Sequence, residues 1–161
     1  MDLELVKIDF PEGMNIIFGQ SHFIKTVEDI HEALAISSPG IRYGMAFAEA
    51  SGPRLIRKTG NNPELVDIAV KNIQNIGSGH VFLIILENVF PIAVMHALKT
   101  VPEICNIFCA TGNPTYAVVA RNEQGGGVLG VIDGFSPAAV ESDNDIANRK
   151  KFLRDIVEYK Q

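Results

Sequence analysis

Short runs of apolar residues, each closed by Gly, Pro or Asn, recur along the chain and predict strands. In the first run, residues 3–9, apolar and charged positions alternate, as in a strand with one buried face. The other runs lie at 14–19, 41–49, 54–59, 104–110, 115–120 and 128–132. Residues 80–86 differ, because the run after His80 is continuously apolar and therefore predicts a strand covered on both faces.

Four further segments have the spacing and the end signals of helices. They begin at Thr26, at Pro63, at Pro91 and near residue 145. Asn62 is placed to cap the second helix, which Gly77 ends. Ser142 and Asp145 resemble a capping box for the last helix, which is expected over residues 145–158.

The predicted order of elements is β-β-α-β-β-α-β-α-β-β-β-α. Some strands are joined by hairpins and others through helices, which is typical of a mixed β-sheet with helices packed on it. No internal repeat, linker or low-complexity segment interrupts this order. The sequence therefore predicts a single compact α/β or α+β domain over residues 1–161.

Composition narrows the class of protein. Hydrophobic residues make up 47% of the 161 residues, which is enough for a buried core, and the net charge is −5. An acidic chain lacks the clustered Lys and Arg that nucleic-acid binding needs. The sequence shows neither a signal peptide nor an apolar run of membrane-spanning length. We therefore expect a soluble, cytoplasmic protein that binds neither nucleic acid nor membrane.

The two cysteines, Cys105 and Cys109, lie on one predicted strand. Four residues of strand separate them by roughly 13 Å. This distance is too long for a disulfide bond. We expect both to be core thiols of a protein from a reducing compartment.

The first candidate site is the connection GQSHFIKT between the second strand and the first helix. A helix N-terminus offers unpaired backbone amides and a partial positive charge, to which Lys25 adds a full charge. The imidazole of His22 can accept or relay a phosphoryl group, and Gln20 and Ser21 can donate hydrogen bonds to it. The alternative is an ordinary turn in which Ser21 and Thr26 cap the helix and His22 is a surface residue.

The second candidate site follows the strand at 41–49. It contains Glu49, Ser51 and Arg54, with Arg57 further on. A carboxylate beside arginines suits a ribose hydroxyl and a phosphate group. The alternative is a solvated hairpin with surface charges.

His80 and the glycine-rich segment 125–130 are further candidates. His80 opens the continuously apolar strand, where it is either a site residue or a hydrogen-bonded core histidine. The glycines match a dinucleotide-binding pattern only formally, because a strand rather than a helix follows them. They suit a hairpin that lets a ligand or a neighbouring subunit approach closely. The sequence contains neither a P-loop pattern nor the spacing of zinc ligands.

The last candidates follow the buried strand at 104–110. Thr111 and Asn113 are small polar residues that suit contacts to a base or a ribose, or else form an ordinary turn. Phe135 lies between a Gly and a Ser-Pro pair, where its ring can stack on a purine or anchor the loop.

Four longer strings together resemble a known family. They are GQSHFIKTVEDIHEAL, AFAEASGPRLIRKTGNN, VPEICNIFCATGNP and GGGVLGVIDGFSP. In order and spacing, from about residue 3 to residue 158, they resemble the adenosine-specific kinase family of small archaeal and bacterial proteins.

This resemblance implies a compact α/β subunit that binds adenosine and AMP rather than ADP or ATP. It also implies a phosphohistidine and a homo-oligomer, with a trimer favoured. The matching histidines are His22 and His80, and we expect His22 to be the phosphorylated one because Lys25 and helix amides lie beside it. No cofactor is firmly implied, and Mg²⁺ stays open as an aid to phosphoryl transfer. Asn62 stands where the family's pattern has Asp, which argues against a metal at that loop.

We therefore expect an adenosine- and AMP-binding phosphotransferase. The phosphoryl group would rest on a ring nitrogen of His22, neutralised by Lys25, and pass to or from adenosine. Such transfer depends on positioning and charge stabilisation, so it needs few catalytic side chains. The alternatives are a non-catalytic sensor of AMP or adenosine, and an oligomer that binds no ligand.

Overall fold

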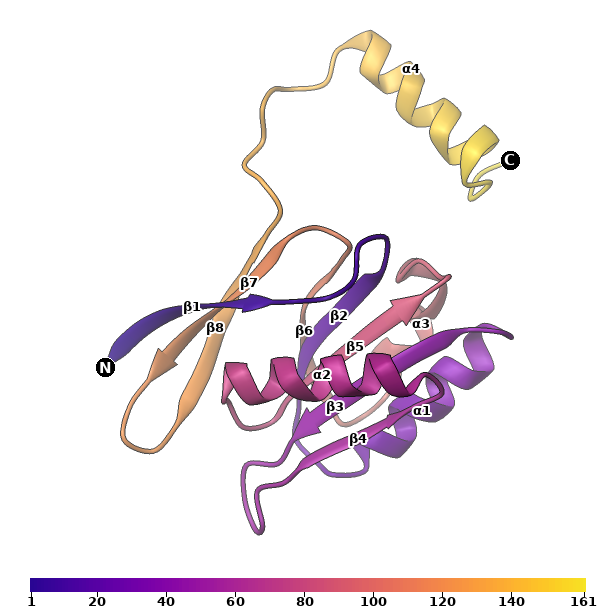
Figure 1. Ribbon diagram of the computed structural model, residues 1–161. Coiled ribbons are helices and arrows are strands. Elements are labelled where there is room, and N and C mark those ends of the chain that lie inside the picture. Colours follow the sequence, from indigo (N-terminus) through magenta and orange to yellow (C-terminus); the bar gives the residue numbers. More distant parts are fainter.

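The structure of the chain is a computed structural model that describes residues 1–161 (Figure 1). Its strands are β1 (Asp2–Ile8), β2 (Asn15–Ser21), β3 (Arg42–Ala48), β4 (Ile56–Gly60), β5 (Val81–Glu87), β6 (Ile104–Thr111), β7 (Thr115–Arg121) and β8 (Gly126–Asp133). Its helices are α1 (Thr26–Ser37), α2 (Pro63–Ile76), α3 (Ile92–Lys99) and α4 (Asp143–Lys151), and a π-helical turn, Phe152–Ile156, follows α4. The predicted order of elements is confirmed.

The strands form two antiparallel sheets, of order β4-β3-β5-β2-β6 and β1-β7-β8. The fold is therefore α+β, and the single mixed sheet expected from the helical connections is not formed. The reason is the position of β5, which lies between β2 and β3 and pairs with both in antiparallel fashion. The strands on either side of the α1 connection, β2 and β3, share a direction but never touch.

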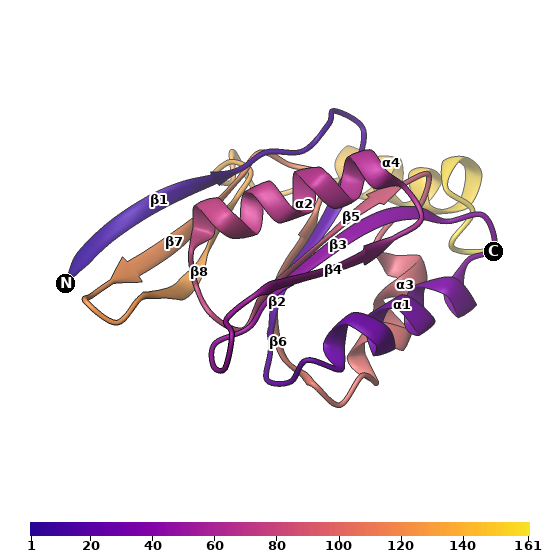
Figure 2. The ribbon, with the colours of Figure 1, turned by 60° about the horizontal axis from the view of Figure 1, so that its bottom comes forward.

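The large sheet separates two apolar cores, and helices cover both of its faces (Figure 2). On one face, α2 and the inner side of the small sheet pack against residues such as Leu83 and Ile85. On the other face, α1 and α3 pack against residues such as Phe82 and Ile84. The prediction for the continuously apolar strand is confirmed, because every residue from Val81 to Leu86 is buried.

The helix ends were predicted with mixed success. Asn62 caps α2, Gly77 ends it in the left-handed conformation, and Ser142 and Asp145 form the capping box of α4. Thr26 does begin α1, but its hydroxyl donates to the carbonyl of Phe23 instead of capping the helix. The last helix begins two residues earlier than predicted and gives way to the π-helical turn at residue 152.

The two cysteines have different environments. Cys109 is buried in the first core, and burial raises the pKa of its thiol to about 12. Cys105 is exposed, so the prediction of a second core thiol is wrong. The physical reason is that β6 is an edge strand of the large sheet, and that its register against β2 shifts at Cys105, which is left without a partner residue.

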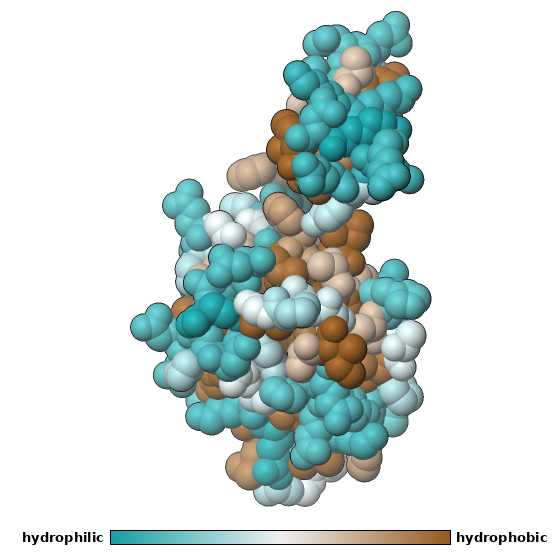
Figure 3. Space-filling view, turned by 90° about the vertical axis from the view of Figure 1, so that its right-hand side faces the viewer, coloured by the Kyte–Doolittle hydropathy of each residue, from teal (hydrophilic) through white to brown (hydrophobic).

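After β8 the chain leaves the body of the molecule. Residues 134–161, which we call the C-terminal arm, run out in extended form and end in α4 and the π-helical turn (Figure 1). In the space-filling view the arm is a separate lobe above the body (Figure 3). No helix in this chain combines the length and the apolar character needed to cross a membrane.

We predict that Gly44→Ala strongly destabilises the protein. A Cβ atom at Gly44 would lie 2.1 Å from the backbone carbon of Leu65, so α2 could no longer rest on β3. Overpacking of this kind costs about 3 kcal/mol. Urea unfolding measures the effect, with Gly130→Ala as the matched control because a Cβ there meets nothing within 4 Å. Equal stability of the two variants would contradict this account of the packing.

Candidate functional site

Most of the predicted site residues gather at one end of the large sheet, where β2 and β3 end and β5 begins. The backbone N–H of Ser21 donates to the carbonyl of His80 over 2.8 Å. The N–H of His80 donates in turn to the carbonyl of Ala48, also over 2.8 Å. These two bonds bring the strand–helix connection, His80 and the β3–β4 turn to the same edge of the molecule.

A polar cavity of about 530 Å³ opens at this end. Thirteen residues line it, and only three of them are hydrophobic. Its walls come from the β3–β4 turn, with Glu49 and Arg54, from the loop before β5, and from the glycine-rich β7–β8 hairpin. The structure thus joins two candidates, the Glu49–Arg54 segment and the glycines, that lie far apart in the sequence.

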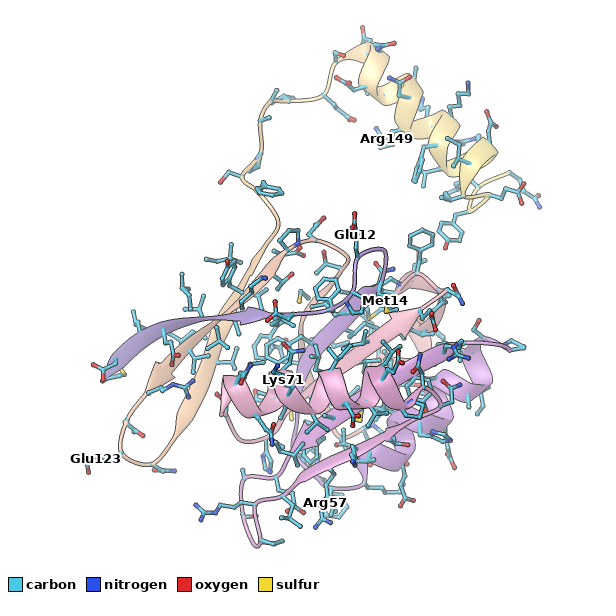
Figure 4. All side chains as sticks on the ribbon, in the orientation of Figure 1. Glu12, Met14, Arg57, Lys71, Glu123 and Arg149 are labelled. Carbon is cyan, nitrogen blue, oxygen red and sulfur yellow. The ribbon has the colours of Figure 1, made fainter.

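The carboxylate of Glu49 holds the β3–β4 turn in place. It accepts from the backbone N–H of Leu55 at 2.8 Å and from Nε and Nη2 of Arg57 at 3.0 and 2.9 Å. The hydrogen bond from Leu55, supported by Arg57, holds the pKa of Glu49 below its ordinary value of 4.5. Glu49 is therefore an ionised acceptor at neutral pH, and Arg57, labelled in Figure 4 beside this turn, is occupied by it.

Arg54 is the free cation of the turn. It is exposed, it lines the cavity, and its φ angle of 52° is unusual for a residue with a side chain. Ser51 is exposed in the same turn, and its carbonyl accepts from the N–H of Arg54 over 3.2 Å. The turn therefore presents a carboxylate and an unpaired guanidinium side by side at the cavity.

Glycines are required at the cavity because the chain approaches itself closely there. A Cβ at Gly126 would lie 2.7 Å from Oγ of Ser78, and one at Gly79 would lie 2.8 Å from Cβ of Ala50. The glycine-rich hairpin thus packs on the loop before β5, and Figure 4 shows its tip near Glu123. Of these glycines only Gly126 makes a close approach within the chain, to Ser78 and Gly77, whereas Gly125, Gly127 and Gly130 face open space.

The two candidate histidines differ in their surroundings. The ring of His80 stacks on Phe47, with 6.0 Å between centroids, and its backbone φ is 60°. His22 is exposed beyond the end of β2, and its ring lies 6.4 Å from that of Phe23. Neither imidazole lines the polar cavity, although Gly79, next to His80, does.

The cation expected beside His22 is engaged elsewhere. Nζ of Lys25 donates to Oδ2 of Asp29 at 3.1 Å, one helical turn further along α1. Lys25 also occupies the cap position of α1, which has no side-chain cap. Gln20 is exposed, whereas Ser21 is fully buried and its Oγ has no hydrogen-bond partner.

The sequence analysis missed a buried acid at this end, Glu103. It is 4% exposed, and its backbone carbonyl accepts from the N–H of His22 at 3.0 Å. Burial, and then the nearby Asp29, raise the pKa of Glu103. Glu103 is in turn the main cause that lowers the pKa of Asp29, although Oε2 of Glu103 is buried without a hydrogen-bond partner. A lone Glu after Pro102 in the sequence gives no signal of this pairing.

Thr111 and Asn113 lie at the opposite end of the large sheet. Thr111 pairs with Ile16, five residues along β2 from Ser21, which is roughly 17 Å of strand. Its hydroxyl donates to Asp133 at 2.7 Å, and the side-chain amide of Asn113 donates to the same oxygen at 3.1 Å. The predicted site is therefore divided between two ends of the sheet, and Asp133 is a partner that the sequence analysis did not single out.

A second cavity, of about 510 Å³, lies at that opposite end and is mostly apolar. Thr111 lines it together with aromatic residues of the body and of the arm, Phe90, Phe152 and Tyr159. Phe135, expected to stack on a purine, is 90% exposed on the arm and lines neither cavity.

Comparison with known proteins agrees with this fold. Residues 6–160 match the family model described as adenosine specific kinase. The crystal structure of the PH1918 protein from Pyrococcus horikoshii OT3 is similar over 99% of this chain and 98% of that chain. The two share 40% sequence identity, and the TM-score is 0.94. No curated protein matches the chain.

The fold is an antiparallel α+β domain with a polar cavity at its strand ends, lined by Glu49 and by the arginines Arg54 and Arg121. The family match, which covers nearly the whole chain, makes this description more specific. The chain belongs to the adenosine-specific kinase family, and this membership supports an adenosine kinase-like function.

We predict that the Glu49 hydrogen bonds stabilise the fold in a pH-dependent way. Because the folded-state pKa of Glu49 is lowered, its contribution is present above 4.5 and is lost as the pH falls through the folded-state value. Glu49→Gln should therefore unfold at lower urea than the wild type at pH 7, with a gap that narrows toward pH 3. The control is Glu12→Gln, at the exposed β1–β2 turn (Figure 4), which should show no gap. A gap for Glu49→Gln that is constant with pH would contradict the assignment.

Proposed function

We propose that the protein binds adenosine or AMP in the polar cavity between the β3–β4 turn and the β7–β8 hairpin. The observation that carries this proposal is the meeting of Glu49, Arg54 and the glycine-rich hairpin around one cavity of about 530 Å³. That volume lies within the range of small-molecule sites. Family membership supports the choice of a nucleoside as the ligand.

In this proposal each side chain meets the part of the nucleotide that its chemistry suits. The ionised carboxylate of Glu49 has lone pairs beyond those used by Leu55 and Arg57, so it can accept from ribose hydroxyls. Arg54 is not paired to any carboxylate, so its guanidinium is available to a phosphate of AMP. Ser51, exposed in the same turn, can donate a hydrogen bond at the rim.

We further propose that a histidine at this end of the sheet carries the phosphoryl group. In the transfer step the P–N bond to the imidazole breaks and a bond from phosphorus to the 5′-oxygen of adenosine forms. The hydroxyl proton ends on the released ring nitrogen. The step requires a phosphohistidine formed beforehand by a phosphate donor.

Of the two histidines, we favour His80 over His22, which reverses the order expected from the sequence. His80 is bonded through its backbone to Ala48, next to Glu49, and its neighbour Gly79 lines the cavity, whereas its own ring stacks on Phe47. Its φ of 60° is a strained conformation of the kind often found at functional sites. His22 lies one strand further away, and the ammonium group of Lys25 is taken by Asp29.

We predict that Arg54→Gln weakens AMP binding about tenfold, or about 1.4 kcal/mol, and leaves adenosine binding nearly unchanged. The reason is that Arg54 would contact only the phosphate. Titration calorimetry with both ligands measures the effect. Arg42→Gln is the matched control, since Arg42 is an exposed arginine at the other end of β3, paired with Glu87.

Equal loss for AMP and adenosine would contradict the role given to Arg54. Unchanged affinity for both would show that the phosphate of AMP does not contact Arg54. Tight AMP binding without any turnover would favour the sensor function over the phosphotransferase. If the protein bound neither ligand, the remaining alternative would be an oligomer that binds no ligand.

We predict that His80→Asn abolishes acid-labile phosphate on the protein. Asn tolerates positive φ angles, so the backbone conformation at this position is kept. Intact mass before and after mild acid measures the bound phosphate, because phosphohistidine is acid-labile. His22→Asn should keep the phosphate, and His96→Asn on α3 serves as the control. Loss of phosphate in His22→Asn alone would return the role to His22.

A further inference from the structure

The outer face of the small sheet is apolar and uncovered. Because directly paired residues point to the same side of an antiparallel sheet, Leu3, Leu5, Tyr116 and Ile132 share the face that is turned away from the core. Their exposed fractions are 69%, 58%, 38% and 47%, and the bulged Leu129 beside them is 65% exposed. Five large apolar side chains on one short sheet form an exposed patch of the kind that marks an interaction site.

Apart from Lys7, which pairs with Tyr116 at the end of β1, the charged and apolar positions of this strand are the reverse of those expected for a solvated face. Antiparallel sheets usually turn polar residues toward water. In β1, the charged Glu4 points to the inner side, where its carboxylate binds Arg121. The leucines on either side of it, Leu3 and Leu5, point outward to solvent. A contiguous patch of this kind is typical of a surface that another surface covers.

The C-terminal arm is ordered internally but is hardly packed on its own chain. The capping box of α4 and the pair between Arg149 and Glu141, with Nη2 3.0 Å from Oε1, fix its conformation. No residue of α4 is buried, and Phe135 and Val140 are 90% and 94% exposed. Only the end of the arm returns to the body, at the apolar cavity near Phe90. Isolated helices shorter than about 12–15 residues are marginal in water, so α4 needs a packing partner.

We propose that the outer face of the small sheet is covered by the C-terminal arm of a second copy of this chain. Each copy carries both halves of such a contact, and the apolar residues of both halves are exposed in a single copy. Figure 3 shows the arm as a lobe apart from the body. One side of a standard interface uses about 20–30 residues. The arm, residues 134–161, is long enough to supply them. Its internal order lowers the entropy cost of docking. This proposal is independent of the nucleoside-binding proposal.

The first test is the mass of the full-length protein in solution, measured by analytical ultracentrifugation over a range of concentrations. The wild type should be an assembly, and Leu5→Asp and Leu129→Asp should shift it to a monomer with unchanged circular dichroism. Ile36→Asp is the matched control, because Ile36 is 81% exposed on α1 in the other layer of the molecule. It should leave the assembly intact.

The second test asks whether the arm reaches across. Two chains of different tag length, one with Leu5→Cys and the other with Val140→Cys, are mixed and treated with a flexible bis-maleimide. Both also carry Cys105→Ser, because Cys105 is exposed. The proposal expects a covalent product that joins the two tags, and no such product with Ile36→Cys in place of Leu5→Cys.

A monomeric wild type at all concentrations would overturn the proposal. So would an assembly that survives both Leu5→Asp and Leu129→Asp. Dissociation by these variants without a cross-link between the two tags would show that the face is covered by something other than the arm, which also overturns it.

Discussion

The insertion of β5 between β2 and β3 is the constraint on which the rest of this structure depends. Its run from Val81 to Leu86 has no polar side chain, so neither of its faces can meet water without loss of hydrophobic stabilisation. The central position satisfies this requirement, with α1 and α3 on one face and α2 with the small sheet on the other. In this position β5 pairs with both β2 and β3 in antiparallel fashion.

The candidate site is a consequence of that insertion. The first residues of β5 and the loop before it have to pass between the ends of β2 and β3, and they do so through glycines. Gly79 meets Ala50, and Gly126 of the small sheet meets Ser78, so three separate segments enclose the polar cavity. Glu49 then stabilises the turn that presents Arg54, which means that one carboxylate serves both the fold and the site.

Much of the fold could be predicted because it depends on local chemistry. The capping roles of Asn62 and Ser142, the left-handed Gly77 and the buried run of β5 each follow from a few adjacent residues. The environment of Cys105 could not be predicted, because the sequence pattern of this strand does not show whether it lies at the edge or in the centre of the sheet. The expectation of a mixed sheet was wrong for a similar reason. The order of strands in a sheet depends on contacts between distant segments, so no single segment predicts it.

The candidate site was only partly predictable. Glu49 and Arg54 were found because they are close in sequence and chemically paired, and the structure places both at the cavity. Thr111 and Asn113 had equally suitable chemistry but lie at the other end of β2, bound to Asp133. Glu103 gave no sequence signal, because its environment arises only when β6 is placed beside the start of α1.

The sequence by itself determined the type, order and ends of the elements, because hydrophobic periodicity and capping act over a few neighbouring residues. Tertiary structure alone decided which strand ends meet, which glycines touch another segment, and which apolar side chains remain uncovered. Those outcomes depend on contacts between residues far apart in the chain, such as Gly126 with Ser78 and Leu5 with Val118. Such contacts are selected by the packing of the whole molecule, and no local pattern specifies them.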